Sequence, residues 1–181
     1  MVHLYRTIVL PSVLYGCEIW GHINNTDMQR LNVFQHFVCK NIIGLPKYSR
    51  SDIAESLSGL LPIRSEIVIR KLLFLGRLCR LNYRMLPKRV FMTRLFSFLE
   101  NLSEKQIGFI PDIISLLQEF DLFEVFNEWI VYGSFPSKLH WKCIVRNAVN
   151  DSFKQSRITR MSHDTDFSRF CSTFPDNAVR L

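Results

Sequence analysis

The sequence predicts an all-α fold, an irregular bundle of about seven to eight helices. Apolar residues recur at spacings of three and four along much of the chain, which is typical of helices with one buried face. No stretch alternates between apolar and polar residues for long enough to predict a strand. Hydrophobic residues make up 48% of the 181 residues and include 15 Phe, so the helices can bury a core.

The first helix is expected over residues 4–20, with a bend or a start at Pro11, because proline interrupts the α-helical hydrogen-bond ladder. A second helix is expected to begin at Thr26, which has the capping-box spacing to Gln29. Its apolar residues repeat at helical intervals up to Gly44, the expected stop signal. These apolar residues are Leu31, Phe34, Val38 and Ile42.

A long helix is predicted from Pro62, because proline suits the first helical turn and the next proline is Pro87. It would span about 20 residues, or roughly 30 Å, and forms the centre of the predicted fold. A short helix capped by Ser51 and ending at Gly59 precedes it. Further helices are expected to begin at Pro87, Pro111, Asp121 and Ser137.

The predicted elements are sparsest over residues 101–108. This stretch is the expected boundary between a helical domain at 1–100 and a helical extension at 101–181. The helical pattern weakens after Asp151, and residues 163–181 are polar with scattered aromatic side chains. We expect this tail to be weakly ordered, either frayed or loosely docked.

Positive charge is concentrated on the long central helix and just after it. Nine Lys and Arg residues and one acid, Glu66, lie between Arg64 and Arg94, a net charge of +8 against +7 for the whole chain. Such a patch is typical of a phosphate-binding surface, although a solvated helix face has the same composition. At about 100° per residue, one narrow arc of the helix contains Arg70, Arg77, Arg80 and Arg84. The candidate nucleic-acid-binding residues are Arg70, Lys71, Arg77, Arg80, Arg84, Lys88 and Arg89.

Other kinds of site are not expected. The five cysteines are widely spaced, which favours buried thiols in a reducing compartment over disulfides. Two His-x-x-Cys pairs, His36 with Cys39 and His140 with Cys143, would form a zinc site only if folding brought them together. The sequence has no Gly-rich phosphate loop, HExxH motif or nucleophile elbow. We therefore expect no enzyme activity, no cofactor and no small-molecule substrate.

The chain is expected to be intracellular, either nuclear or cytoplasmic. No apolar run reaches the roughly 18 residues that a membrane span needs. The apolar N-terminal segment is followed by Glu18 and Trp20 and lacks the small-residue cleavage site of a signal peptide.

Six stretches resemble the region that follows the palm in reverse transcriptases of non-LTR (LINE-class) retrotransposons. Residues 9–21 read VLPSVLYGCEIWG, which is similar to that family's Leu/Ile-x-Pro-x-x-x-Tyr-Gly-x-Glu-x-Trp pattern, with Val9 in the first place. Leu31-x-x-x-Gln35 and IIGLPKYS at 42–49 follow in the same order. The remaining matches are LLPI at 60–63, RKLLFLGRL at 70–78 and GSFPSKLHWK at 133–142. Order and spacing agree over roughly residues 4–150.

The resemblance implies a thumb and post-thumb region without catalysis of its own. The family's palm, whose acidic pair binds the catalytic Mg²⁺, has no counterpart here, and neither have its endonuclease and Cys/His zinc knuckle. The chain is thus expected to be a truncated form or a decayed element. In the complete polymerase the thumb is a helical bundle that holds the template–primer duplex by its backbone. The implied partner is RNA or an RNA–DNA duplex, bound through phosphate contacts of the arginine-rich helix.

Three alternatives to nucleic-acid binding are open from the sequence. The chain could be a helical protein-interaction module, in which exposed Phe and Trp form an apolar patch. It could be a membrane-surface helix that binds anionic lipid. It could also be a remnant without a function. Nucleic-acid binding predicts a log–log salt slope of roughly −3 to −4 for four phosphate contacts, which the alternatives do not.

Overall fold

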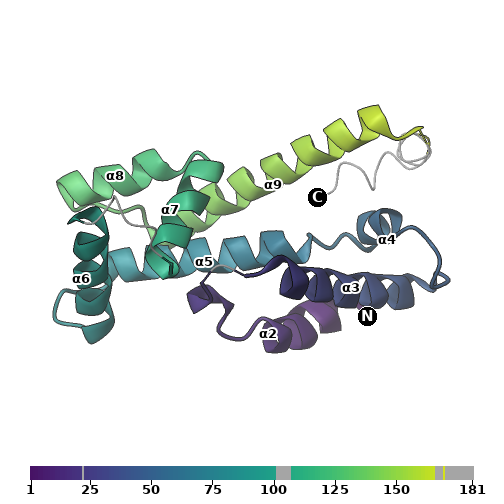
Figure 1. Cartoon of the computed structure of the whole chain (residues 1–181), viewed down its shortest axis with the longest axis horizontal. Helices are drawn as coiled ribbons and strands as arrows, with labels where there is room; N and C mark the ends of the chain where they lie inside the picture. Colours follow the sequence, from purple (N-terminus) through teal and green to yellow (C-terminus); the bar gives the residue numbers. More distant parts are fainter. Residues whose placement is uncertain (22, 101–106, 166–168, 170–181) are drawn as a thin grey trace. The chain divides into compact units, whose positions relative to one another are not determined.

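The computed structural model describes residues 1–21, 23–100, 107–165 and 169 (Figure 1). Every regular element within these ranges is helical and none of their residues forms a strand, which confirms the predicted all-α class. The expected weakly ordered tail, 163–181, lies mostly outside the described residues. The longer helices are α3 (Asn25–Ile43), α4 (Ser51–Ser58), α5 (Ile63–Arg80), α6 (Leu86–Glu100), α7 (Phe109–Glu119), α8 (Phe123–Tyr132) and α9 (Lys138–His163).

The chain forms two compact units. The first unit contains Met1–Tyr15, Asn24–Glu66 and Asn150–Leu181, and the second contains Gly16–Ile23 and Ile67–Val149. Each unit takes segments from both predicted domains, 1–100 and 101–181, so the division does not follow the chain order. The change from one unit to the other falls inside α5 and inside α9.

The N-terminal helical run is shorter and less regular than predicted. It consists of α1 (Val2–Leu4), the π-helical turn η1 (Tyr5–Val9) and α2 (Leu10–Val13), and the 3₁₀ turn η2 (Cys17–Ile19) follows. The Leu10 N–H donates to the Tyr5 carbonyl, five residues back, as in a π turn. Pro11 comes next and has no N–H, so a wider turn relieves the crowding of its ring. Gly16, at φ +71°, reverses the chain and prevents the expected helix from reaching residue 20.

Three predicted helix starts are displaced in the structure, for local reasons. α3 is capped by Asn24, not Thr26, because the Asn24 Oδ1 accepts the Asp27 N–H at 2.7 Å. Ser51 is the first residue of α4 rather than its cap, and the following Asp52 carboxylate accepts the Ile53 N–H at 3.0 Å. α8 begins at Phe123 because Asp121 adopts a left-handed conformation, with φ +55°.

Other predicted helix ends are confirmed. Gly44 and Gly59 both adopt left-handed conformations directly after α3 and α4. Ser137 precedes α9, and its Oγ accepts the His140 N–H at 3.3 Å. α9 nevertheless continues past Asp151, where the sequence pattern weakens, and reaches His163. α7 begins at Phe109, which places Pro111 in its first turn.

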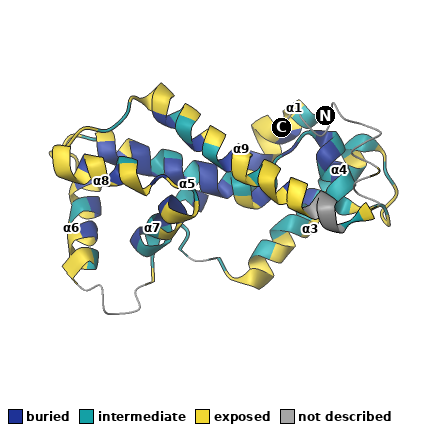
Figure 2. Cartoon of the chain, turned by 90° about the horizontal axis from the view of Figure 1, so that it is seen from above, coloured by how far each residue is buried: buried dark blue, intermediate teal, exposed yellow. Residues whose placement is uncertain are grey.

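The core of the second unit forms around α5, most of whose surface is buried from Ile67 onward (Figure 2). Trp141 of α9 is fully buried against this helix and donates its Nε1–H to the Leu72 carbonyl at 2.8 Å. Gly76 makes the approach possible, because a Cβ there would lie 2.3 Å from the indole Cδ1. A helix-interior glycine thus provides the notch that accepts the fully buried indole of Trp141.

Tyr5 lies in the core of the first unit and is 3% exposed. Its hydroxyl has no hydrogen-bond partner among the described residues. Burial, with smaller contributions from Cys39, Glu66 and Glu55, raises the pKa of Tyr5 to about 12. Ionisation of this side chain therefore opposes folding.

Replacing Tyr5 by Phe is expected to make the unfolding free energy less sensitive to alkaline pH. The native pKa lies above the ordinary value of 10.0, so the stabilising difference is complete below pH 10 and is lost as the pH rises towards 12. At pH 11 the loss attributable to Tyr5 is about 1 kcal/mol. Urea unfolding at pH 8 and pH 11 measures it, with Tyr15→Phe as the control at an exposed tyrosine. If Tyr5→Phe lost as much unfolding free energy between pH 8 and pH 11 as the unmodified chain, the alkaline loss could not be due to Tyr5.

Candidate nucleic-acid interface

Four of the predicted basic residues are exposed around the connection between α5 and α6. Arg77 and Arg80 lie in the last turn of α5, Arg84 in the connecting turn and Arg89 in the first turns of α6. We call these four residues the arginine elbow. None of them forms an ion pair with a described acid. Arg84 is not on the α5 arc as predicted, because α5 ends at Arg80.

Asn82 shapes the turn of the elbow. Its side-chain oxygen accepts the Arg84 N–H at 2.9 Å and its carbonyl accepts the Met85 N–H at 3.0 Å. These bonds satisfy backbone donors between the two helices and fix where the chain turns. The end of α5 and the start of α6 are thereby joined by a short turn, and both helix ends have exposed arginines.

Arg80 is the most constrained member of the elbow. Its Nη1 donates to the Pro136 carbonyl at 3.1 Å, and its guanidinium lies 5.6 Å from the centre of the Phe135 ring. Burial against these groups lowers the pKa of Arg80, which keeps its positive charge at any physiological pH. A guanidinium has five N–H donors, so one bond to Pro136 leaves others that can reach a phosphate.

Lys71 is buried, contrary to its expected place on the interface. Only 3% of the residue is exposed, and its Nζ lies 2.5 Å from the Asp112 carboxylate of α7. The ammonium group is therefore neutralised inside the second unit. Arg70, next to it, is partly buried, so neither residue presents an open side chain as the elbow does.

Lys88 is also buried, with 1% exposed, although it follows a proline at the start of α6. Its Nζ donates to the Cys79 carbonyl at 3.0 Å and lies 4.2 Å from the centre of the Trp129 ring. Tyr83 and Phe91 present two further rings at 5.2 and 6.0 Å. Burial lowers the pKa of Lys88, and this lysine connects α5, α6 and α8 rather than contacting a ligand.

The second unit also contains an apolar groove of about 630 Å³. It lies along one side of α6, where Leu86 and Val90 form part of its wall, and reaches the start of α7 at Ile110. Arg94 is the single charged residue among those that line it. The volume is within the roughly 300–1,000 Å³ range of small-molecule sites, and the lining suits an apolar group.

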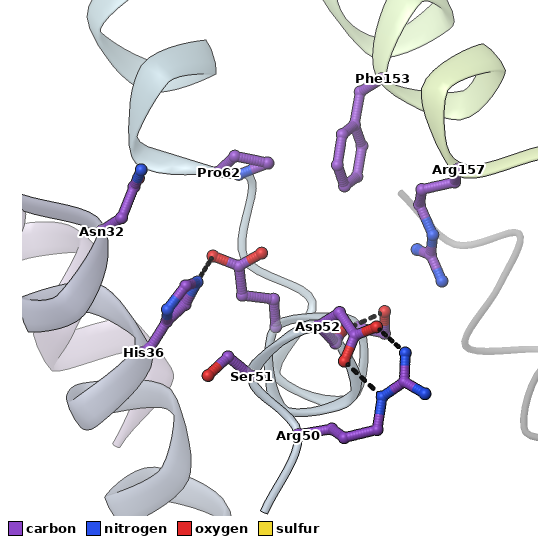
Figure 3. A pocket seen from close by; sticks show the side chains of 10 residues that line it. Asn32, His36, Arg50, Ser51, Asp52, Pro62, Phe153 and Arg157 are labelled. Atoms are coloured by element: carbon purple, nitrogen blue, oxygen red, sulfur yellow. Dashed lines mark hydrogen bonds and ion pairs between the residues drawn. The ribbon is translucent and has the colours of Figure 1, made fainter. Parts of the chain in front are cut away.

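The first unit has a separate polar cavity of about 460 Å³ (Figure 3). On one side, the buried guanidinium of Arg157 lies 5.7 Å from the centre of the Phe153 ring, both from α9. On the other side, His36 of α3 lies with its Nε2 3.1 Å from the Glu55 carboxylate of α4. Acidic and basic residues line the cavity in similar numbers, so it lacks the excess positive charge that a phosphate backbone would need.

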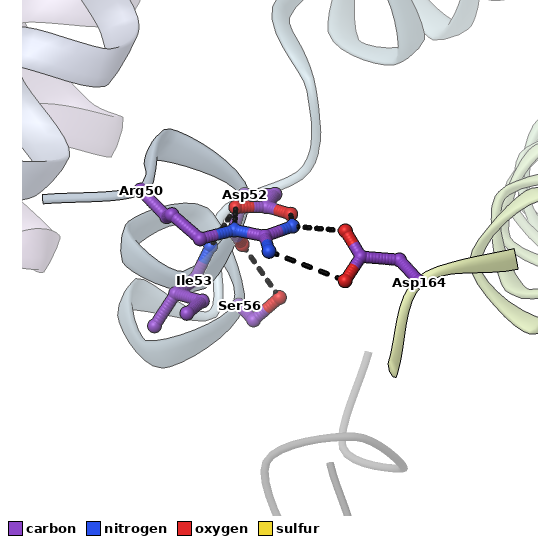
Figure 4. Close-up of polar contacts among 5 residues, drawn as sticks. All are labelled: Arg50, Asp52, Ile53, Ser56 and Asp164. Atoms are coloured by element: carbon purple, nitrogen blue, oxygen red, sulfur yellow. Dashed lines mark hydrogen bonds and ion pairs between the residues drawn. The ribbon is translucent and has the colours of Figure 1, made fainter. Parts of the chain in front are cut away.

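Arg50, at the edge of this cavity, is fully engaged by two carboxylates (Figure 4). It binds Asp52 through Nε at 3.2 Å and Nη2 at 2.7 Å, and Asp164 at 3.2 and 2.6 Å. These hydrogen bonds, first to Asp52 and then to Asp164, raise the pKa of Arg50. Burial disfavours the Asp52 carboxylate, but its hydrogen bonds from Arg50 and Ile53 outweigh that effect and lower its pKa.

The possible zinc site is not formed within the described residues, where no group of three or more His, Cys, Asp or Glu side chains is placed to hold a metal ion. His36 is instead bonded to Glu55, and Cys39 is buried next to the Ser58 hydroxyl at 3.5 Å. Among the helices that the structure describes, none is both long enough and apolar enough to cross a membrane.

No model of a known protein family matches the chain, and no curated protein or solved structure matches it either.

Proposed function

We propose that this chain is a helical, non-catalytic protein that binds the backbone of RNA or of an RNA–DNA duplex through the arginine elbow. The observation that carries the proposal is the set of four exposed arginines at the α5–α6 connection, none of which is neutralised by a described acid. Guanidinium groups bind phosphate oxygens through paired hydrogen bonds, and such contacts are independent of base sequence.

The charge of the second unit supports this choice of partner. Between Ile67 and Arg94 the chain has eight Lys and Arg residues and no acid. Two of these, Lys71 and Lys88, are buried and therefore contribute mainly to the core. The exposed remainder is arginine throughout, the residue best suited to pair with phosphates while stacking on neighbouring rings.

We further propose that the chain derives from the thumb and post-thumb region of a non-LTR retrotransposon reverse transcriptase. The motifs at 9–21, 42–49, 60–63, 70–78 and 133–142 support this origin. We place the chain in the nucleus or the cytoplasm, where its nucleic-acid partner would be found. Buried thiols at Cys17, Cys39 and Cys79 are compatible with a reducing compartment.

Replacing Arg77, Arg80, Arg84 and Arg89 by Gln is expected to abolish most of the salt-dependent affinity. Four phosphate contacts give the intact chain a slope of roughly −3 to −4 in log K against log salt. The quadruple variant should bind at least tenfold more weakly at about 50 mM salt and show a slope near zero. Fluorescence anisotropy with a labelled RNA–DNA duplex measures both quantities.

The matched control removes the same charge elsewhere, by changing the exposed residues Arg30, Lys47, Lys138 and Arg146 to Gln. This variant should keep most of the slope, because the four arginines of the elbow and their phosphate contacts are unchanged. Equal losses in both variants would show that only net charge matters. A folded intact chain that fails to bind at low salt would overturn the proposed function.

A second candidate function is protein interaction, and exposed apolar residues favour it. On α6, Leu86 is 69% exposed and Val90 52% exposed, and both line the apolar groove. Phe96 of the same helix is 54% exposed. Exposed apolar side chains in one region are common at protein contacts.

A further inference from the structure

The second unit separates its charges along the chain. Residues 107–132, which include α7 and α8, contain five acids and no Lys or Arg. One of these acids, Asp112, is neutralised internally by Lys71. Glu124 and Glu128 of α8 are exposed, and neither forms an ion pair with a described residue. The positive counterpart, residues 67–94, has eight basic residues and no acid.

The acidic helix α8 also exposes apolar side chains. On α8, Phe123 is 39% exposed and Val131 63% exposed. Glu124, Glu128 and Val131 are spaced i, i+4 and i+7, which places them on one face of the helix. This face of α8 therefore combines negative charge with an apolar end.

The exposed side of α6 has the complementary composition. Arg89 and Arg94 are exposed and have no acidic partner within the described ranges. Arg94 lines the apolar groove, and Val90 lies between the two arginines in sequence and also lines it. A helix that brings carboxylates together with an aromatic side chain would satisfy both the charge and the groove.

We propose that the chain self-associates, with α8 of one copy docking on α6 of a second copy. Glu124 and Glu128 then face Arg89 and Arg94, and Phe123 enters the groove. Among the described residues of one chain these charges have no ion-pair partner, and a second copy supplies the opposite sign on the same unit. A two-fold arrangement would make the contact twice, α6 to α8 and α8 to α6, which favours a closed dimer.

The first test measures the mass of the full chain by sedimentation velocity after nuclease treatment, over a range of concentrations. We expect a dimer at about 50 mM salt whose dissociation constant rises at least tenfold at about 500 mM, because salt screens exposed ion pairs. A chain that is monomeric under both conditions would overturn the proposal.

A charge swap locates the contact. Glu124→Lys with Glu128→Lys in one chain, and Arg89→Glu with Arg94→Glu in another, should each weaken self-association by about a hundredfold, since like charges then meet. An equimolar mixture of the two variants should restore a dimer, because each chain complements the other. All four positions are exposed, so circular dichroism should show unchanged helix content.

Arg146→Glu is the control, since this exposed residue of α9 lies outside the proposed contact and its change should leave the dimer intact. A dimer that survives both charge reversals would place the interface elsewhere and overturn the proposal, as would two monomeric variants that do not combine. The test contains no nucleic acid, so it fails or succeeds independently of the proposed function. Because Arg89 belongs to both surfaces, duplex binding is expected to compete with dimer formation.

Discussion

Gly76→Ala is expected to destabilise the second unit by about 2–3 kcal/mol, although alanine is normally the better helix former by about 1 kcal/mol. The added Cβ would lie 2.3 Å from Cδ1 and 2.5 Å from Nε1 of Trp141. The indole is fully buried and cannot move without losing its 2.8 Å hydrogen bond to the Leu72 carbonyl. The clash would therefore also leave the buried indole N–H of Trp141 without its acceptor.

A double-mutant cycle isolates this contact. In a Trp141→Leu chain the indole is absent, so adding Gly76→Ala should cost nothing or stabilise by up to about 1 kcal/mol. Urea unfolding followed by far-ultraviolet circular dichroism gives the four free energies. If Gly76→Ala were equally harmful in both backgrounds, the close packing of the glycine on the tryptophan would not be the cause.

Asp112→Ala is expected to destabilise the same unit by about 3–5 kcal/mol, because it leaves the Lys71 ammonium buried without a counter-charge. The Lys71 side chain is 4% exposed and the Asp112 side chain 19%, at a separation of 2.5 Å. Asp112 also lies in the first turn of α7, where a negative charge is favourable. Thermal and urea unfolding of the variant measure the loss.

Replacing both partners distinguishes the effect of the Lys71–Asp112 ion pair from any other role of Asp112. Lys71→Met with Asp112→Leu removes the two charges together and keeps most of the volume, so its stability should fall within about 1 kcal/mol of the unmodified chain. A double variant as unstable as Asp112→Ala would instead indicate that Asp112 is needed for α7 itself. Duplex binding by the stable double variant should be unchanged, because Lys71 is not exposed.

Fold class and most helices were predictable because they depend on local signals. Gly44 and Gly59 end helices as the sequence indicates, and Ser137 caps α9. The errors occur where two local signals compete. Asn24 and Thr26 are both capping residues, and only the folded geometry shows that Asn24 reaches the Asp27 N–H. The grouping into two units could not be predicted, since it depends on contacts between distant segments.

The sequence located a stretch of basic residues but did not indicate which of their side chains are exposed. Counting the Lys and Arg residues of a stretch does not distinguish exposed side chains from buried ones. Lys71 lies four positions after Ile67 and four before Leu75, both buried, so helical spacing alone could have placed it on the buried face. Its partner Asp112 is 41 positions away, and no local pattern reveals such a pairing.

Lys88 illustrates the same limit. It lies three positions before the buried Phe91 and seven before the buried Leu95, a spacing that predicts the inner face of α6. Its charge argues for the outer face. The structure resolves the conflict, because the Cys79 carbonyl, nine positions earlier, accepts a hydrogen bond from the ammonium group, which also lies 4.2 Å from the centre of the Trp129 ring.

The notch at Gly76 also has a consequence for how related chains can change over generations. Any side chain larger than hydrogen at position 76 is incompatible with an indole at position 141, so neither position can vary alone without loss of stability. Homologous chains should therefore show paired substitutions, with alanine or serine at 76 accompanied by a smaller residue at 141. An alignment of such chains should reveal this covariation between two positions that are 65 residues apart.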